Sequence, residues 1–278
     1  MAPLRTLFLM SSLTSLSRLT VRAASSHVPQ RRAMSSFKLH PTIFNATLYA
    51  QLTDLWLPNV DSTGSELDPS LLQRWFSSDP ALDRTCRDSF AHALEAIGPE
   101  NVEPSAQPFV DEIERAGDDG AWTALSLAIL LDQMPRNIYR TDEGLRKVYT
   151  HYDPMAYNLS RALLSPDKRV DLRPQFRHSI AHRMWLYMPL MHSEDIEAHK
   201  LVDGILADAK SDVAGRKGSE MMLAGQLKAE KEHREILDRF GRYPHRNGAL
   251  GRVSTEAEKK FIREGGATFG VKQARDEL

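Results

Sequence analysis

Hydrophobic positions from residue 37 onward recur every three or four residues, which is the spacing of one face of an α-helix. One such segment follows Asp79-Pro80, where a capping aspartate precedes a proline at the first helical position, and Gly98-Pro99 favours its end. Its apolar positions are Leu82, Cys86, Phe90, Ala93, Leu94 and Ile97. The period-two alternation that marks strands is missing from the sequence. The pattern therefore predicts a chain built of helices.

The same pattern predicts one buried central helix with others around it. Residues 122–131 are apolar on nearly all sides, which is typical of a fully buried helix, and Pro135 is expected to end that segment. Polar stretches at 165–174 and 210–218 are expected to be loops. Further helices are predicted to begin at Asp68-Pro69, at about 106, 142, 154 and 175, after Ser193, at Glu220, and after Thr255, where Glu258 completes a capping box. The helix that begins at 175 is expected to end near Pro189.

These signals predict roughly nine or ten helices and no sheet, in a single all-α domain that covers about residues 37–270. No fixed-period repeat is visible, although successive helix pairs would suit a helical-hairpin array. Residues 1–36 are expected to form an N-terminal extension, and residues 271–278 a C-terminal tail.

Composition indicates an ordinary soluble globular protein. Of the 278 residues, 41% are hydrophobic and 26% are charged, which fits neither disorder nor a membrane protein. No stretch approaches the ~20 apolar residues of a membrane-spanning helix, so we expect no membrane insertion. Cys86 is the only cysteine, which excludes a disulfide framework or a cysteine-rich zinc site within the chain.

The N-terminal extension has the composition of a targeting segment. Residues 1–36 contain five arginines, many serines and no acidic residue, which is typical of a mitochondrial transit peptide, so we expect the mitochondrial matrix. Met34 as an internal start would give a cytosolic form instead. The tail Arg275-Asp276-Glu277-Leu278 resembles a retention signal of the endoplasmic reticulum. The apolar run near residue 7 is soon broken by serines, which favours the mitochondrion over secretory entry.

Removing the extension changes the charge balance. Without its five arginines the chain has 31 basic and 37 acidic residues, a net charge near −6. Nonspecific nucleic-acid binding depends on clustered Lys and Arg that displace phosphate counterions. An acidic core therefore argues against a nucleic-acid partner.

Two stretches, 132–137 and 241–247, each combine a proline with an arginine–asparagine pair. Guanidinium groups bind phosphate or carboxylate through paired hydrogen bonds, and imidazole carries protons near neutral pH. The candidate ligand-binding residues are Gln133, Arg136, Asn137, Arg242, Arg246 and Asn247. The candidate catalytic residues are His192 and His245 as acid or base, with Asp132 and Glu194 to orient them.

A structural role explains the same residues. Helix ends leave carbonyl groups without partners, and buried Arg and Asn side chains satisfy such groups. Ion pairs from Asp132 or Glu194 to an arginine would serve the same purpose. Both interpretations remain open at this point.

The sequence gives weaker evidence for metal binding and for nucleophilic catalysis, and we expect neither a metal nor a cofactor. His178 and His182 lie four apart on one predicted helix face, and Glu230 with His233 forms half of a di-iron signature. The second half is absent, and charged neighbours indicate solvated helix faces. No nucleophile elbow, phosphate-binding glycine loop or dinucleotide motif is present.

Four segments resemble the domain-of-unknown-function 924 family. They are Leu-Ala-Ile-Leu-Leu-Asp-Gln-Met-Pro-Arg-Asn-Ile-Tyr-Arg at 127–140, Tyr-Met-Pro-Leu-Met-His-Ser-Glu at 187–194, Phe-Gly-Arg-Tyr-Pro-His-Arg-Asn at 240–247 and Gly-Arg-Val-Ser-Thr-Glu at 251–256. The four segments occur in the same order as in the family, across most of residues 44–262. The resemblance implies an all-helical fold similar to tetratricopeptide-like arrays. It implies no activity. The polar stretch 211–218 departs from the family pattern.

The sequence therefore supports two hypotheses of different classes. In the first, a polar pocket at converging helix ends binds a small anionic metabolite and transforms it by acid–base chemistry. In the second, a helical-array scaffold binds a peptide or protein partner, and the polar motifs are structural. A closed polar cavity would favour the pocket, and a concave face lined with exposed apolar side chains would favour the scaffold.

Overall fold

The computed structural model describes residues 37–271, which lie in one compact unit, Ser36–Leu278. Every regular element in this range is a helix, so the predicted all-α fold class is confirmed for the described residues. No helix in the described range combines the length and apolar character that crossing a bilayer requires. The predicted targeting segment 1–36, the internal start Met34 and the tail 272–278 lie outside the described residues.

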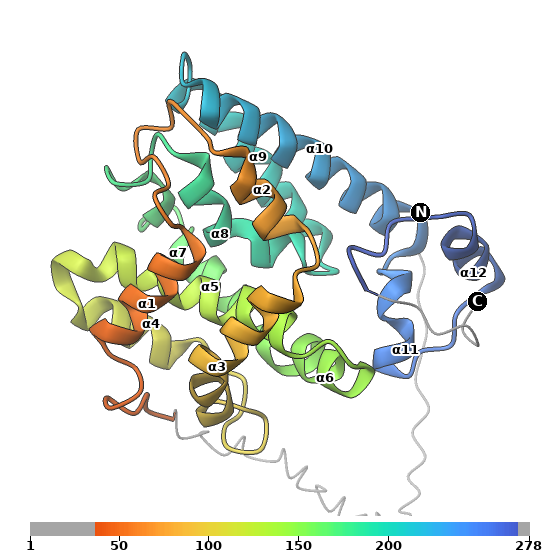
Figure 1. Ribbon diagram of the computed structural model, residues 1–278. Helices are drawn as coiled ribbons and strands as arrows, with labels where there is room; N and C mark the ends of the chain where they lie inside the picture. The colour runs from red at the N-terminus through yellow and green to blue at the C-terminus, as the bar shows by residue number, and fades with distance from the viewer. Residues whose placement is uncertain (1–36, 272–278) are drawn as a thin grey trace, which may run out of the picture. The chain divides into compact units, whose positions relative to one another are not determined.

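The helices follow one another closely along the chain (Figure 1). In order they are α1 Ala46–Trp56, α2 Pro69–Phe76, α3 Pro80–Ala96, α4 Gln107–Arg115, α5 Gly120–Ile138, α6 Asp142–Lys147, α7 Asp153–Leu163, α8 Ile180–Met191, α9 Ile196–Asp212, α10 Lys217–Phe240, α11 Asn247–Leu250 and α12 Glu256–Arg263. Short turns of other helix types are η1 Gly117–Asp119, the π-helical η2 Val148–Tyr152, η3 Val170–Leu172 and η4 Pro244–Arg246.

Helix α5 is the centre of the main hydrophobic core. It packs against α1, α3, α4, α7 and α8, and nearly all of its residues are buried. Helix α10 lies along α8 and α9 on one side of this core (Figure 1). The apolar segment 122–131 therefore forms the buried central helix that its composition predicts.

Pro135 does not end that helix, contrary to the sequence prediction. Helix α5 continues one turn further to Ile138, where the N–H of Tyr139 donates to the carbonyl of Pro135 at 2.8 Å. The prolyl nitrogen lacks a hydrogen, so one backbone hydrogen bond is lost. Burial of α5 among five other helices offsets that loss. The polar residues of 132–137 consequently lie on the last two turns of a helix and not in a loop.

Helix α8 repeats this arrangement. Pro189 was expected to end it, yet the helix runs through Pro189 to Met191, and all of its residues are buried. Its start is also later than predicted, at Ile180, because residues 173–178 form turns. His192 is therefore the residue that caps the C-terminal end of a buried helix.

The capping signals are confirmed where side chains determine the helix start. Asp68 and Asp79 accept backbone hydrogen bonds at the starts of α2 and α3, and Thr255 with Glu258 forms the capping box of α12.

The prediction of a loop over residues 210–218 is wrong. Helix α9 extends to Asp212 and α10 starts at Lys217, so the connection shrinks to four residues.

The C-terminal part of the chain packs through a second, smaller hydrophobic cluster. Its buried members are Ile236, Leu237 and Tyr243, and residues of α12 and the following segment pack against them. Gly241, with φ of +68°, ends α10 and turns the chain back toward the core. This return brings the second proline–arginine motif beside the end of α5.

A buried ion network fixes the start of α8. Arg183 is fully buried; its guanidinium lies 3.0 Å from Asp171 and 3.1 Å from Asp212. Asp171 also pairs with Arg169, and Asp212 with Arg177. The network joins the loop before α8 to the end of α9. Because α8 carries His192 at its other end, these pairs also set the position of that histidine.

We predict that Arg183→Met lowers the free energy of unfolding by about 3 kcal/mol, because two buried carboxylates lose their fully buried partner and keep only the more exposed Arg169 and Arg177. Urea unfolding monitored by circular dichroism measures the change. Lys200→Met is the matched control, because Lys200 and Glu197 form an exposed pair whose loss should cost well under about 1 kcal/mol. Equal effects of the two substitutions would contradict the assigned role of Arg183.

Candidate functional site

The two proline–arginine motifs meet around one cavity of about 370 Å³. Arg136 reaches it from the end of α5, His192 from the end of α8, and His245 and Arg246 from η4. The full lining consists of Ser78, Pro80, Asp83, Arg136, Arg140, Leu145, Tyr149, His192, His233, Tyr243, His245, Arg246, Phe269, Gly270 and Val271. Of the candidate residues, the structure thus brings Arg136, His192, His245 and Arg246 to one pocket.

Asp132 and His192 form a hydrogen-bonded pair beneath the cavity. Nδ1 of His192 lies 2.8 Å from Oδ1 of Asp132, and the amide of Gln133 donates to Oδ2 at 2.6 Å. Burial alone would raise the pKa of Asp132, but Arg136, His192 and Gln133 lower it to about 2. The carboxylate is therefore ionised at neutral pH and accepts the proton of Nδ1. This leaves Nε2 of His192 as the ring nitrogen with a free lone pair.

A single carboxylate joins Arg136 to Arg246. Asp153, the first residue of α7, accepts from Nη1 of Arg136 at 2.6 Å and lies 3.5 Å from Nη1 of Arg246. Arg136 also lies 3.5 Å from Asp132, one turn earlier in α5. Burial alone would lower the pKa of Arg136, whereas the two carboxylates raise it, so its guanidinium stays charged.

Aromatic rings hold Arg246 in place and form much of the cavity wall. The guanidinium carbon of Arg246 lies 4.5 Å from the ring centre of Tyr149 and 5.0 Å from that of Tyr243. The rings of His233 and Phe269, which also line the cavity, stack with centres 4.0 Å apart. The pocket therefore combines buried cations with several flat ring surfaces.

All three histidines of the lining have lowered pKa values. Burial and the Arg136 guanidinium lower the pKa of His192, against the opposing effect of Asp132. Burial lowers the pKa of His233 to about 3, and burial with Arg246 holds the pKa of His245 well below its usual range. The imidazoles are consequently neutral at pH 7, and the other charged residues of the lining are Asp83, Arg136, Arg140 and Arg246.

Of the charged residues predicted from the sequence, Asp132, Glu194 and Arg242 lie outside the lining, and Asp132 contacts it through His192 and Arg136. Glu194 forms a bidentate salt bridge with Arg252, with both N···O distances at 2.9 Å, and accepts a hydrogen bond from the backbone N–H of Tyr243. Arg242 forms a bidentate salt bridge with Glu258, the capping-box residue of α12. These contacts tie helix ends together, which is the structural role that the sequence left open.

The predicted amide residues also contact protein groups and do not line the cavity. Asn137 donates to the carbonyl of Gln133 at 2.9 Å, within the last turn of α5. Asn247 donates to the hydroxyl of Ser254 at 3.0 Å, and its carbonyl accepts from the N–H of Arg252. Gln133 acts indirectly, through its hydrogen bond to Asp132.

The sequence did not predict the lining residues Tyr149, His233, Tyr243 and Phe269, nor Asp153, which pairs with Arg136 beside the cavity. His233 was noticed only as part of a Glu-x-x-His pattern on a face assigned to solvent, yet it is 8% exposed and Glu230 is 2% exposed. Glu230 pairs instead with the buried His199 at 2.7 Å. A buried histidine facing another helix has no signature that distinguishes it from an exposed one in a single sequence.

The paired histidines considered for a metal are separated by the fold. His178 precedes the first residue of α8, and its Nδ1 bonds the carbonyl of Asp212. His182 lies within α8 and bonds the hydroxyl of Ser179. The two therefore do not share a helix face. Within residues 37–271, no group of three or more His, Cys, Asp or Glu side chains is arranged to hold a metal ion.

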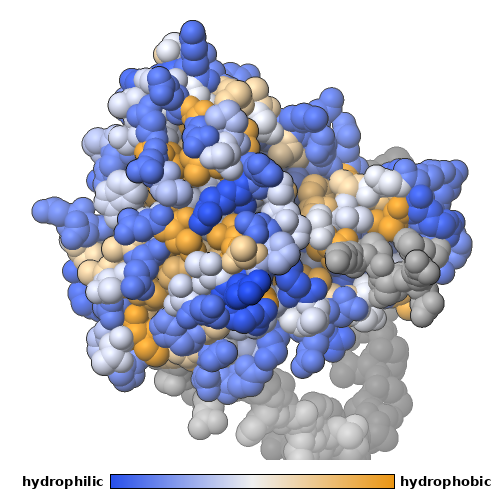
Figure 2. Space-filling model, viewed as in Figure 1, coloured by the Kyte–Doolittle hydropathy of each residue, from blue (hydrophilic) through white to orange (hydrophobic). Residues whose placement is uncertain are grey.

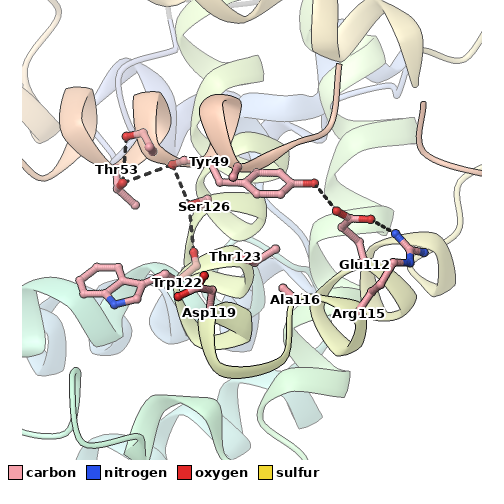
Figure 3. Close-up of a pocket in the computed structure, with 11 residues that line it drawn as sticks. Tyr49, Thr53, Glu112, Arg115, Ala116, Asp119, Trp122, Thr123 and Ser126 are labelled. Atoms are coloured by element: carbon pink, nitrogen blue, oxygen red, sulfur yellow. Dashed lines mark hydrogen bonds and ion pairs between the residues drawn. The ribbon is translucent and has the colours of Figure 1, made fainter. Parts of the chain in front are cut away.

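A larger cavity of about 490 Å³ lies between α1, α4 and α5 (Figure 3). Its polar groups bond to one another. Tyr49 donates to Glu112 at 3.1 Å, Glu112 pairs with Arg115, and Ser126 donates to the carbonyls of Tyr49 and Trp122. Burial and the Glu112 carboxylate raise the pKa of Tyr49, so it remains a neutral donor. The smaller pocket, with its histidines and arginines, is thus the candidate site.

Comparisons with known proteins agree with the fold. A solved structure, described as that of a protein of unknown function, ATU0120, from Agrobacterium tumefaciens, is 29% identical with a TM-score of 0.52; the match covers 79% of this chain and 99% of that one. No curated protein matches the chain. The sequence model of the family described as bacterial protein of unknown function (DUF924) matches residues 52–266. The chain therefore belongs to the DUF924 family, as the resemblance of its motifs predicted.

Proposed function

We propose that the pocket binds a small anionic metabolite and that His192 transfers a proton to or from it. The observation that carries this proposal is the meeting of the Asp132–His192 pair with Arg136 and Arg246 at one cavity. Charged and titratable groups with shifted pKa values that gather in a concave pocket are typical of binding and catalytic sites.

Hydrogen-bond donors without acceptors support an anionic ligand. Among the described residues, the buried side-chain atoms without a hydrogen-bond partner include the donors Nη2 of Arg136 and Nε of Arg246, and also Oδ2 of Asp153 between them. A buried donor without a partner costs about 1–3 kcal/mol, and more when the group is charged. A carboxylate or phosphate oxygen next to these two side chains would supply the missing acceptor.

The orientation of His192 supports proton transfer. Asp132 accepts from Nδ1, so Nε2 is the nitrogen that would act as a general base toward a ligand in the cavity. The lowered pKa keeps the imidazole neutral, which a base requires. The same carboxylate would stabilise the imidazolium that forms once the proton has moved, and Asp132 acts in this way as a positioning residue.

The surface gives less support to a scaffold for a peptide. In the described part of the chain, the exposed large apolar side chains are Phe76, Trp122, Met221, Val253 and Phe269, which belong to five different segments. On the face drawn in Figure 2, hydrophilic residues dominate and apolar residues appear mainly in narrow stretches between them. A peptide-binding groove would instead gather such side chains on one concave face.

We predict that small carboxylates or phosphates raise the melting temperature of the protein and that Arg246→Met abolishes the rise. A ligand present at about 100 times its Kd stabilises the native state by about 2.7 kcal/mol, which corresponds to several degrees. Differential scanning fluorimetry of the full chain with a panel of such anions measures the shift.

Arg242→Met is the matched control, because Arg242 pairs with Glu258 outside the cavity lining. Its melting temperature should fall because that pair is lost, while the response to ligand remains. A ligand response that survives in Arg246→Met, or that disappears equally in both variants, would argue against the pocket.

We further predict that binding takes up protons and strengthens as the pH falls from 8 to 6. The free protein keeps its three lining histidines neutral because their pKa values are lowered. A bound anion favours the imidazolium form and raises these pKa values, so the complex holds more protons than the free protein. Calorimetric titration in two buffers of different ionisation enthalpy measures the uptake. Proton release, or affinity that falls with decreasing pH, would contradict the arrangement.

We also propose, from composition alone, that residues 1–36 direct the protein to mitochondria. A fluorescent protein fused after residue 36 is expected to enter mitochondria, and a variant with the five arginines of the segment changed to glutamine should remain in the cytosol. Cytosolic fluorescence of the unchanged fusion would reject the proposal.

A further inference from the structure

We propose that the ligand of this pocket is a single planar aromatic or heteroaromatic ring that carries one negative charge. This inference rests on the proposed function and specifies its ligand class. Three properties of the described residues carry it: the ring surfaces of the wall, the charge balance of the lining, and the position of Phe269.

Ring side chains make up much of the cavity lining, and Tyr243 among them also contacts the guanidinium of Arg246. His233 and Phe269 stack at 4.0 Å with an interplanar angle of 17°, and His245 approaches Phe269 at 5.3 Å. Tyr243 meets both His233 and Phe269 edge to face. Stacked and edge-to-face contacts favour an aromatic partner over a saturated group of the same size. A cavity of about 370 Å³ is near the lower limit of ligand pockets, which limits the ligand to a small ring.

The charge balance of the pocket favours a single negative charge. Arg136 and Arg246 are opposed by the ionised Asp132 and Asp153, and Arg140 at the cavity edge pairs with Asp83. The lining is therefore close to neutral while its histidines are neutral. One anionic group would supply an acceptor for the two buried guanidinium nitrogens that lack one, whereas a second would lie near carboxylates without a cation of its own.

Phe269 is the lining residue whose side chain is best placed to adjust to a bound ring. It is 41% exposed, belongs to the segment after α12, and has a φ of +52°, which is a strained conformation for a bulky residue. Its contacts with His233 and Tyr243 hold it there. The family match ends at residue 266, so the charged residues of the pocket fall inside the matched range and Phe269 falls outside it. We infer that Phe269 determines ring preference and does not contribute to charge recognition.

The test compares benzoate with cyclohexanecarboxylate by isothermal titration calorimetry of the full chain. The two anions have the same charge and carbon number and differ in aromaticity. Benzoate is expected to bind about fivefold more tightly, the effect of one good aromatic contact. In Phe269→Leu this ratio should fall close to one while cyclohexanecarboxylate keeps its affinity. Phe240→Leu is the matched control, because Phe240 packs on Phe261 and does not line the cavity, and its ratio should be unchanged.

The possible outcomes separate the two proposals. Equal binding of the two anions, lost in Arg246→Met, would overturn the aromatic inference and leave the anion pocket standing. Absence of binding by either anion would overturn the inference, and absence across the wider anion panel would overturn the proposed function as well. Tighter binding of the dianion isophthalate than of benzoate would overturn the assignment of a single charge.

Discussion

Burial of the Arg136 guanidinium at the end of α5 requires two carboxylates, Asp132 from the same helix and Asp153 from the start of α7. Its Nη1 lies 2.6 Å from Asp153 and 3.5 Å from Asp132. Asp153 also lies 3.5 Å from Arg246, and Asp132 bonds His192 at 2.8 Å. Alternating charges thus connect the ends of α5 and α8 to α7 and η4. Removing one member takes a partner from each neighbour in a partly buried network, so the positions of the pocket side chains depend on one another.

This network of charged residues places the candidate site residues at the ends of two buried, closely packed helices. Helix α5 is buried among five other helices, and α8, which carries His192, is fixed at its other end by the buried Arg183 pairs. Side chains positioned by well-packed helices keep their geometry better than side chains on loops. Histidines with lowered pKa values also destabilise the folded protein as the pH falls below their ordinary pKa, because the unfolded chain then binds protons that the buried imidazoles do not. Retaining three such histidines around one cavity is easier to understand for a binding site than for a purely structural one.

The sequence predicted most of the fold because local signals determine it. Apolar periodicity gives the helices, and side chains such as Asp79 and Thr255 specify their starts. The errors at Pro135 and Pro189 have a common cause, since tertiary burial sustains a helix past a proline that would end an isolated one. The site was predicted in part. Motif residues Arg136, His192 and Arg246 meet as expected, whereas the contribution of Asp153, His233 or Phe269 depends on helix packing that no single-sequence pattern encodes.

The most direct test of this account is the tautomer and titration of His192, observed through the ¹⁵N chemical shifts of its ring. The structure predicts a proton on Nδ1, directed at Asp132, an unprotonated Nε2 at pH 7, and a pKa below the usual value for histidine. Addition of benzoate should raise that pKa, because the bound anion favours the imidazolium form. A proton on Nε2 in the free protein, or a His192 pKa that no anion changes, would contradict the assignment of His192 as the base of an anion-binding pocket.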